Sequence, residues 1–179
     1  MIDRRFFTGA GGLWLACAAV SRRARAAARA EIRMRSDVDG AAVWFDPVGL
    51  WVAPGTTVRW VIESNVHTVT AYHPDNDGHS LRIPETAQPW DSGYLVNPGD
   101  AFEVTLTVPG VYDYYCAPHE EGGMVGRIVV GAPSGPGSRP FEYFKTLDPV
   151  PSWLDVPDAA QRNFPSIDRI VAERAVRRH

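Results

Sequence analysis

Apolar and polar residues alternate strictly from Phe102 to Val108, and the turn-forming pair Pro109-Gly110 ends the run. A period of two places successive side chains on opposite faces of a strand, so this strand buries one face and exposes the other. Val111–Cys116 and Met124–Val130 resume as strands on either side of a short loop. These strands, joined by tight turns, predict an all-β fold.

Short β-branched and aromatic runs recur upstream, each bounded by proline or glycine. We expect further strands at 42–45, 50–52, 57–62 and 67–72. Seven or eight short strands over about 100 residues are typical of a β-sandwich. The sequence therefore predicts one sandwich domain, which we place at residues 31–131.

The C-terminal part has a different composition. Residues 132–140 are rich in Gly, Pro and Ser and are predicted to be a linker. In the tail, 141–179, Ser166 can cap a helix over 167–178 whose Ile and Val residues share one face. We expect this short helix to dock on the sandwich, and a helix that binds a partner is the alternative.

The first 30 residues are typical of an export signal. Arg4-Arg5, with Phe7 two places on, resembles the twin-arginine export motif. The apolar run Gly9–Val20 would span only about 18 Å as a helix, too short for a bilayer core of about 30 Å. Ala28-Arg29-Ala30 is a plausible cleavage site. We therefore predict a periplasmic or otherwise extracytoplasmic protein with no membrane span after cleavage; a short retained anchor is the alternative.

Cysteine usage then becomes informative. Cys17 would leave with the signal, and lipid attachment there is not expected because Trp14 stands where a lipoprotein signal has Leu. Cleavage after Ala30 leaves Cys116 as the only cysteine, so no intramolecular disulfide can form. An unpaired thiol in an oxidising compartment is a liability unless it is buried or bound. Cys116 is therefore the residue whose chemistry must be explained.

The predicted mature chain is acidic. Residues 31–131 carry 5 Lys and Arg against 14 Asp and Glu, whereas residues 132–179 carry 7 against 6. A negative body argues against nucleic acid and anionic lipid as partners, because both would repel it. It favours a basic protein partner, with simple solubility as the alternative explanation.

The loop after Cys116 concentrates metal-binding chemistry in the pattern Cys-x2-His-x4-Met, which places Cys116, His119 and Met124 between two strands. Sulfur ligands together with imidazole favour copper, and two histidines, one cysteine and a distant methionine form a blue-copper electron-transfer site. The second histidine must come from elsewhere. His67 follows a predicted strand, and a sandwich can bring its loop beside Cys116. We predict a single copper ion held by these four residues.

The remaining histidines are weaker candidates. His73 precedes Pro74 in a turn, and His79 lies in a loop rich in Asp, Asn and Gly, so both are expected to be solvated. His179 is the last residue. A zinc site with the same four ligands remains an alternative, and it would leave the protein colourless.

The motif Tyr114-Tyr115-Cys116-Ala117-Pro118-His119 followed by Gly123-Met124-Val125-Gly126 closely resembles the plastocyanin, pseudoazurin and halocyanin group of blue-copper cupredoxins. His67 matches the upstream ligand of that family, and 54–60 resembles the strand that leads to it. The resemblance covers about residues 40–131. It implies a cupredoxin-like Greek-key β-sandwich, here with a C-terminal extension.

One residue departs from the family pattern. Thr68 stands where plastocyanins usually have an Asn whose side chain ties the two ligand loops together. The Thr68 hydroxyl is the candidate replacement. Since Pro118 has no N–H, the backbone N–H of Thr68 is, by resemblance, the expected donor to the sulfur of Cys116.

The resemblance implies a soluble, monomeric carrier that exchanges single electrons with redox proteins, for example a c-type cytochrome or a respiratory reductase. Electrons are expected to pass through His119. By resemblance Tyr115 is a candidate second route, and a packed strand aromatic is the alternative. Glu120 and Glu121 are candidates to steer a basic partner, and a solvated loop pair is the alternative. An enzyme is not expected, because Tyr115 and Ala117 flank the cysteine where copper oxidases and nitrite reductases have histidine. Copper storage or delivery is the alternative function.

Overall fold

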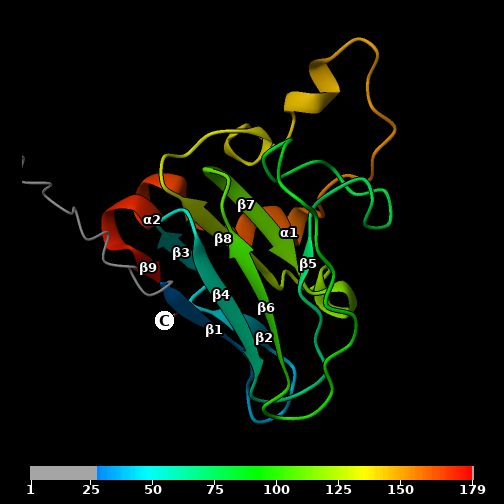
Figure 1. Cartoon of the computed structure of the whole chain (residues 1–179). Helices are drawn as coiled ribbons and strands as arrows, with labels where there is room; N and C mark the ends of the chain where they lie inside the picture. The colour runs from blue at the N-terminus through cyan, green and yellow to red at the C-terminus, as the bar shows by residue number, and fades with distance from the viewer. Residues whose placement is uncertain (1–27, 179) are drawn as a thin grey trace, which may run out of the picture.

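The computed structural model describes residues 28–178, and the predicted export signal therefore lies outside the described residues except for its last three (Figure 1). The strands are β1 (Arg29–Ser36), β2 (Val43–Asp46), β3 (Gly49–Val52), β4 (Thr56–Ile62), β5 (Thr70–Ala71), β6 (Ala101–Leu106), β7 (Gly110–Tyr115), β8 (Val125–Val130) and β9 (Ala175–Val176). The helices are α1 (Asp158–Asn163) and α2 (Ile167–Glu173), with 3-10 turns η1 (Ala117–His119), η2 (Pro136–Ser138) and η3 (Tyr143–Thr146).

The strands form two sheets, in the orders β2-β1-β4-β6 and β5-β7-β8-β3-β9 (Figure 1). Most pairs are antiparallel, but β1 runs parallel to β4 and β3 runs parallel to β8. Non-consecutive strands lie side by side in both sheets, so the chain crosses repeatedly from one sheet to the other. The predicted all-β sandwich is confirmed.

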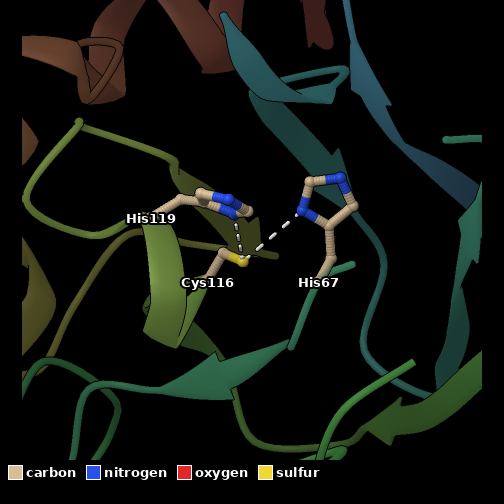
Figure 2. A group of neighbouring side chains, drawn as sticks. All are labelled: His67, Cys116 and His119. Atoms are coloured by element: carbon tan, nitrogen blue, oxygen red, sulfur yellow. Dashed lines mark hydrogen bonds between the residues drawn. The ribbon is translucent and has the colours of Figure 1, made fainter. Parts of the chain in front are cut away.

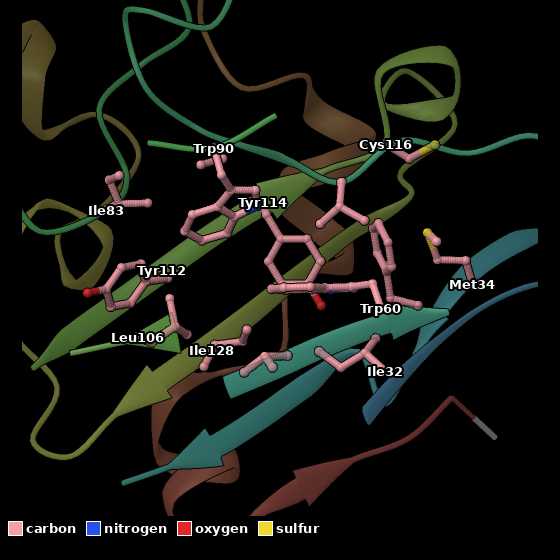
Figure 3. Close-up of a cluster of buried hydrophobic side chains, with 14 of the residues drawn as sticks. Ile32, Met34, Trp60, Ile83, Trp90, Leu106, Tyr112, Tyr114, Cys116 and Ile128 are labelled. Carbon is pink, nitrogen blue, oxygen red and sulfur yellow. The ribbon is translucent and has the colours of Figure 1, made fainter. Parts of the chain in front are cut away.

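Side chains from both sheets fill the space between them (Figure 3). In β4 the buried and half-buried positions alternate along the strand, and Trp60 points inward. Its ring lies 5.4 Å from that of Tyr114 on the opposite sheet and 5.9 Å from that of Trp90. The Cys116 sulfur lies at one end of this core (Figure 3). The packed core therefore fixes the strand end from which the ligand loop leaves.

Strands β1 and β9 were not predicted. In β1, Ile32 and Met34 are fully buried between charged neighbours, an alternation visible in the sequence. The predicted export signal extends to Ala30 and so includes the first two residues of this strand. The alternation that follows was therefore not recognised as a strand. In β9 only two residues pair with β3, which is too short a run to recognise from periodicity.

The C-terminal extension packs on the outer face of the β7-β8-β3 sheet (Figure 1). The segment predicted as a linker, 132–140, is also packed, because the Val111 N–H donates to Ser134 O and η2 lies against β7. Ser166 caps α2 as predicted, accepting from the Arg169 N–H at 3.3 Å. The predicted helix over 167–178 ends early, because Arg174 adopts a φ of 66°.

A buried ion triad joins the extension to the sandwich. Asp113 on β7 is fully buried between Arg82 and Arg127, with N–O distances of 3.0 Å and 2.6 Å. Arg82 also donates to Gly137 O, and Arg127 donates to Pro165 O. Two guanidinium groups around one carboxylate leave excess positive charge, which these carbonyl dipoles from the extension help to compensate. The extension is thus anchored from within the fold.

Among the described residues, no helix has the length and apolar character needed to cross a membrane.

Candidate metal centre

Two loops at one end of the sandwich bring together three of the predicted ligands, His67, Cys116 and His119 (Figure 2). His67 lies between β4 and β5, where its backbone N–H and C=O pair with Leu95. Cys116 directly follows β7, and its N–H donates to Met124 O across the ligand loop at 3.0 Å. The N–H of Met124 in turn donates to His119 O. The loop is therefore closed by backbone hydrogen bonds, and the sandwich holds both of its ends.

The donor atoms converge on one point. The Cys116 Sγ lies 3.5 Å from His67 Nδ1 and 3.3 Å from His119 Nδ1. These three atoms lie within 4.8 Å of one another, close enough to share one metal ion. His67, Cys116 and Met124 are fully buried, whereas His119 is half-buried. The arrangement brings together three of the four donors that the sequence predicted, and the fourth, Met124, is buried in the same loop as Cys116 and His119.

Burial changes the protonation equilibria of the three donor side chains. Burial and the neighbouring His119 lower the pKa of His67 to about 4, and burial also lowers the pKa of His119. Both imidazoles are thus neutral near pH 7, with lone pairs free for a metal. Burial raises the pKa of Cys116 to about 11, so metal binding must displace its proton. A thiolate and two imidazoles fit copper, and Met124 in the same loop supplies a thioether.

Thr68 ties the two ligand loops together. Its N–H donates to Cys116 Sγ at 3.3 Å, and its Oγ1 accepts from the Ala117 N–H at 2.7 Å. Both contacts confirm the roles expected for this residue. The threonine hydroxyl therefore performs the tie that plastocyanins make with an amide side chain.

A second hydroxyl orients the first. The Thr70 Oγ1 lies 3.1 Å from Thr68 Oγ1 and 2.9 Å from Asp91 Oδ1. Thr70 is the donor in both contacts, so its one hydroxyl proton is shared between Thr68 Oγ1 and the carboxylate of Asp91, and Thr68 Oγ1 accepts. A lone pair of Thr68 is then left to face the Ala117 N–H. Sequence reasoning missed both Thr70 and Asp91. Asp91 is distant from every ligand in sequence, whereas Thr70 lies only three residues after His67 but carries no metal-binding group that would single it out.

His79 is not solvated, so that prediction was wrong. It is 8% exposed, with Nε2 3.0 Å from Glu120 Oε2 and Nδ1 2.8 Å from Asn76 O. Burial alone would lower the pKa of His79, but these two oxygen partners outweigh it and raise the pKa. Both ring nitrogens face acceptors, which suits an imidazolium and excludes this ring as a copper ligand. His73 is half-buried and accepts from the Asp75 N–H.

Glu120 differs from expectation, and Tyr115 is the packed aromatic that was the alternative to a second electron route. Glu120 is buried and accepts from Tyr72 OH at 2.6 Å, so only the exposed Glu121 can steer a partner. Tyr115 is 1% exposed, because Val156 and other residues of the extension cover it. Its ring stacks on His79 with centroids 4.5 Å apart. The extension thus separates Tyr115 from any partner surface.

Comparison with known proteins points in one direction. The family model described as copper binding proteins, plastocyanin/azurin family, matches residues 32–131. Plastocyanin A'/A'' of Nicotiana tabacum is 51% identical over 100 residues, which cover 56% of this chain and 98% of that protein. The chloroplastic plastocyanin of Hordeum vulgare is 33% identical over 92 residues, covering 51% of this chain and 57% of that protein.

A solved pseudoazurin from Sinorhizobium superposes on more of the chain. It is 27% identical, with a TM-score of 0.53, and the match covers 81% of this chain and 94% of the pseudoazurin. The coverage exceeds the 100 residues of the family match, so part of the C-terminal extension has a counterpart in that structure.

Proposed function

We propose that this chain, which belongs to the plastocyanin/azurin family of copper-binding proteins, carries single electrons between redox proteins outside the cytoplasm. The observation that carries the proposal is a buried N and S donor set with one half-exposed histidine at its edge. Bound copper supplies the Cu(I)/Cu(II) couple. The surrounding residues supply a site whose shape changes little between the two states.

Rigidity comes from the fold. Cys116 is held at the end of β7, His67 is held by its backbone pair with Leu95, and Thr68 joins the two loops. A ligand set held on all sides reorganises little when its metal changes charge. Electron transfer then needs only a partner close to the ligands, with no substrate pocket and no acid or base. The site therefore supports a carrier and not an enzyme.

The exit route is His119. Its neighbours Ala117 and Pro118 are exposed, and its ring borders a hollow lined by residues 40–43. Pro118 and Ala41 give this surface an apolar character. A partner that covers Pro118 lies against the ring edge of a copper ligand. The electron thus passes through His119, whereas Tyr115 is covered.

One flank of His119 is acidic. Four carboxylate side chains are exposed here: Asp75, Asp77, Asp91 and Glu121. The loop that contains Asp75 and Asp77 is joined to the loop that contains Asp91, because Asn76 Nδ2 donates to Trp90 O. Surface carboxylates raise the association rate of a positively charged partner. We propose that this flank steers a basic redox protein, such as a c-type cytochrome, toward His119.

The proposal is tested by mixing the copper-loaded protein, in its Cu(II) form, with reduced mitochondrial cytochrome c, which is basic. We expect rapid bimolecular reduction that slows as the salt concentration rises. Repeated cycles in the presence of a strong Cu(I) chelator distinguish a carrier from a copper-delivery protein. A carrier keeps its copper through the cycles, whereas loss of copper to the chelator would contradict the proposal and favour delivery.

A further inference from the structure

A groove of about 320 Å³ lies between β2 and the C-terminal extension. Its lining includes Trp44, Val125 and Phe164 and, from the extension, four arginines. The arginines are Arg162, Arg169, Arg177 and Arg178. We call this surface the arginine groove. It combines an apolar floor with a cationic rim, which suits carboxylates carried on a protein surface.

Two of the four arginines in the groove have no carboxylate partner among residues 28–178. Arg169 pairs with Glu173 at 2.8 Å and Arg177 pairs with Asp46 at 2.6 Å. For Arg162 and Arg178, no carboxylate of residues 28–178 lies within 4 Å. The Arg178 guanidinium lies 5.4 Å from the centroid of the Trp44 ring. A cation–π contact thus holds one unpaired charge over the floor of the groove.

The groove is continuous with the surface around His119. Asn163 and Arg178 line both the arginine groove and the hollow that contains Pro118 and His119. Asn163 is itself fixed to the ligand loop, because its Nδ2 donates to Gly123 O at 2.8 Å. A partner seated on the unpaired arginines therefore also covers the ligand through which electrons leave.

We propose that the arginine groove docks an acidic surface of a second redox partner. This inference rests on the proposed function and extends it, because a carrier needs both a donor and an acceptor. The net charge of the sandwich repels an acidic protein, because residues 31–131 carry 5 Lys and Arg against 14 Asp and Glu. The arginine groove attracts an acidic protein and adjoins His119. The carboxylates of the sandwich disfavour other orientations of that protein, so the orientation that covers the groove is selected.

The two proposed partners dock on different sides of His119. The acidic flank contains Asp75, Asp77 and Glu121, whereas the groove lies beyond Gly122 and Gly123 on the side of the extension. Both flanks border the same ligand, so a basic and an acidic protein compete for His119 while they contact different residues. The extension thus supplies the second docking surface of the carrier.

The test compares two forms of one probe. Native mitochondrial cytochrome c is basic, and the same cytochrome is acidic after its lysines have been succinylated. Arg162→Gln with Arg178→Gln should slow electron transfer from the succinylated form about tenfold at low ionic strength. Transfer from the native form should stay the same or rise. The matched control, Arg59→Gln with Arg139→Gln, makes the same change in net charge away from His119 and should have little effect.

A binding measurement separates this proposal from the proposed function. In the ¹⁵N-labelled Cu(I) protein, succinylated cytochrome c should shift the Trp44 indole resonance, and the Arg162/Arg178 double variant should lose that shift. Equal slowing by the two double variants, or no shift at Trp44, would overturn the docking surface. A Trp44 shift with inorganic phosphate but not with the acidic cytochrome would also overturn it. A Trp44 shift without electron transfer from either cytochrome would overturn the carrier function alone.

Discussion

Two histidine clusters lie at the end of β7, on opposite faces of one sheet. In the first, His67 and His119 face the sulfur of Cys116, and no carboxylate joins them. In the second, His79 faces the carboxylate of Glu120 beside Tyr115. Tyr115 and Cys116 are consecutive, so the strand alternation sends them to opposite faces.

The neighbours, and not the residue type, decide what each histidine does. Burial without an anion lowers the pKa of His67 and leaves a neutral donor. Burial beside Glu120 gives His79 a raised pKa and a fixed hydrogen-bonding role. In the described part of the chain, the first cluster places no carboxylate beside its imidazoles, whereas the second places the carboxylate of Glu120 3.0 Å from its ring. The metal centre therefore differs from the second cluster in that its histidines have no carboxylate partner among the described residues.

The largest expected effect is on the visible absorption of the copper-loaded protein, which only the first cluster should influence. His67→Ala removes one of the N donors and should abolish the intense visible band of the copper-loaded protein. His79→Ala, at the same sheet end, should keep that band, because the ring contacts no ligand. Absorption spectra of the two copper-loaded variants check this. If the His79 variant alone lost its colour, the assignment of the two histidines would have to be exchanged.

The second effect is on stability. Glu120→Ala leaves Tyr72 and His79 buried without their shared acceptor, which should cost about 2–3 kcal/mol of unfolding free energy. Glu121→Ala, one residue on and exposed, should change it by less than about 0.5 kcal/mol. Urea unfolding of both apoproteins measures the difference. Equal midpoints would show that the second cluster contributes nothing to stability.

A smaller effect concerns the tie between the ligand loops. Thr68→Val keeps the shape but removes the hydroxyl that accepts from Ala117, which should cost about 1 kcal/mol and shift the visible band. Thr68→Asn restores an acceptor and should recover most of both. The spectrum and unfolding curve of each variant report the outcome. A valine variant with wild-type values in both would refute the tie.

The smallest effect is on the pH dependence of stability, where the two clusters act in opposite directions and in different pH ranges. The pKa of His67 is depressed in the folded apoprotein, so stability falls as pH drops from about 6.5 toward 4. The pKa of His79 is raised, so its contribution is complete below about 6.5 and is lost as pH rises through its folded pKa. His67→Asn should therefore flatten the loss of stability below about pH 6.5, whereas His79→Asn should leave that loss unchanged and remove the decline in stability as pH rises above about 6.5. Unfolding curves between pH 4 and 8 test both slopes.

The sequence predicted the local part of the site well. Cys116, His119 and Met124 lie within one loop, so their spacing alone carries the chemistry. His67 required the further step of a sandwich that joins two distant loops, and Thr68 required the resemblance. These inferences depend on short-range pattern and on a known fold class.

The second cluster could not be predicted, because its burial depends on distant residues. His79 is covered where Leu154 pairs with the backbone beside it, and Val156 covers Tyr115. Nothing in the polar loop around His79 indicates a cover some 75 residues later in the chain. The arginine groove was missed for the same reason, since its arginines gather only when the extension folds back.

The visible and electron paramagnetic resonance spectra of the copper-loaded protein test the metal centre most directly. The account predicts one Cu(II) per chain and an intense visible band from thiolate-to-copper charge transfer. Cys116→Ser should lose this band even if it still binds copper. A colourless wild-type protein with full copper content, or a blue Cys116→Ser variant, would contradict the assignment of the ligands.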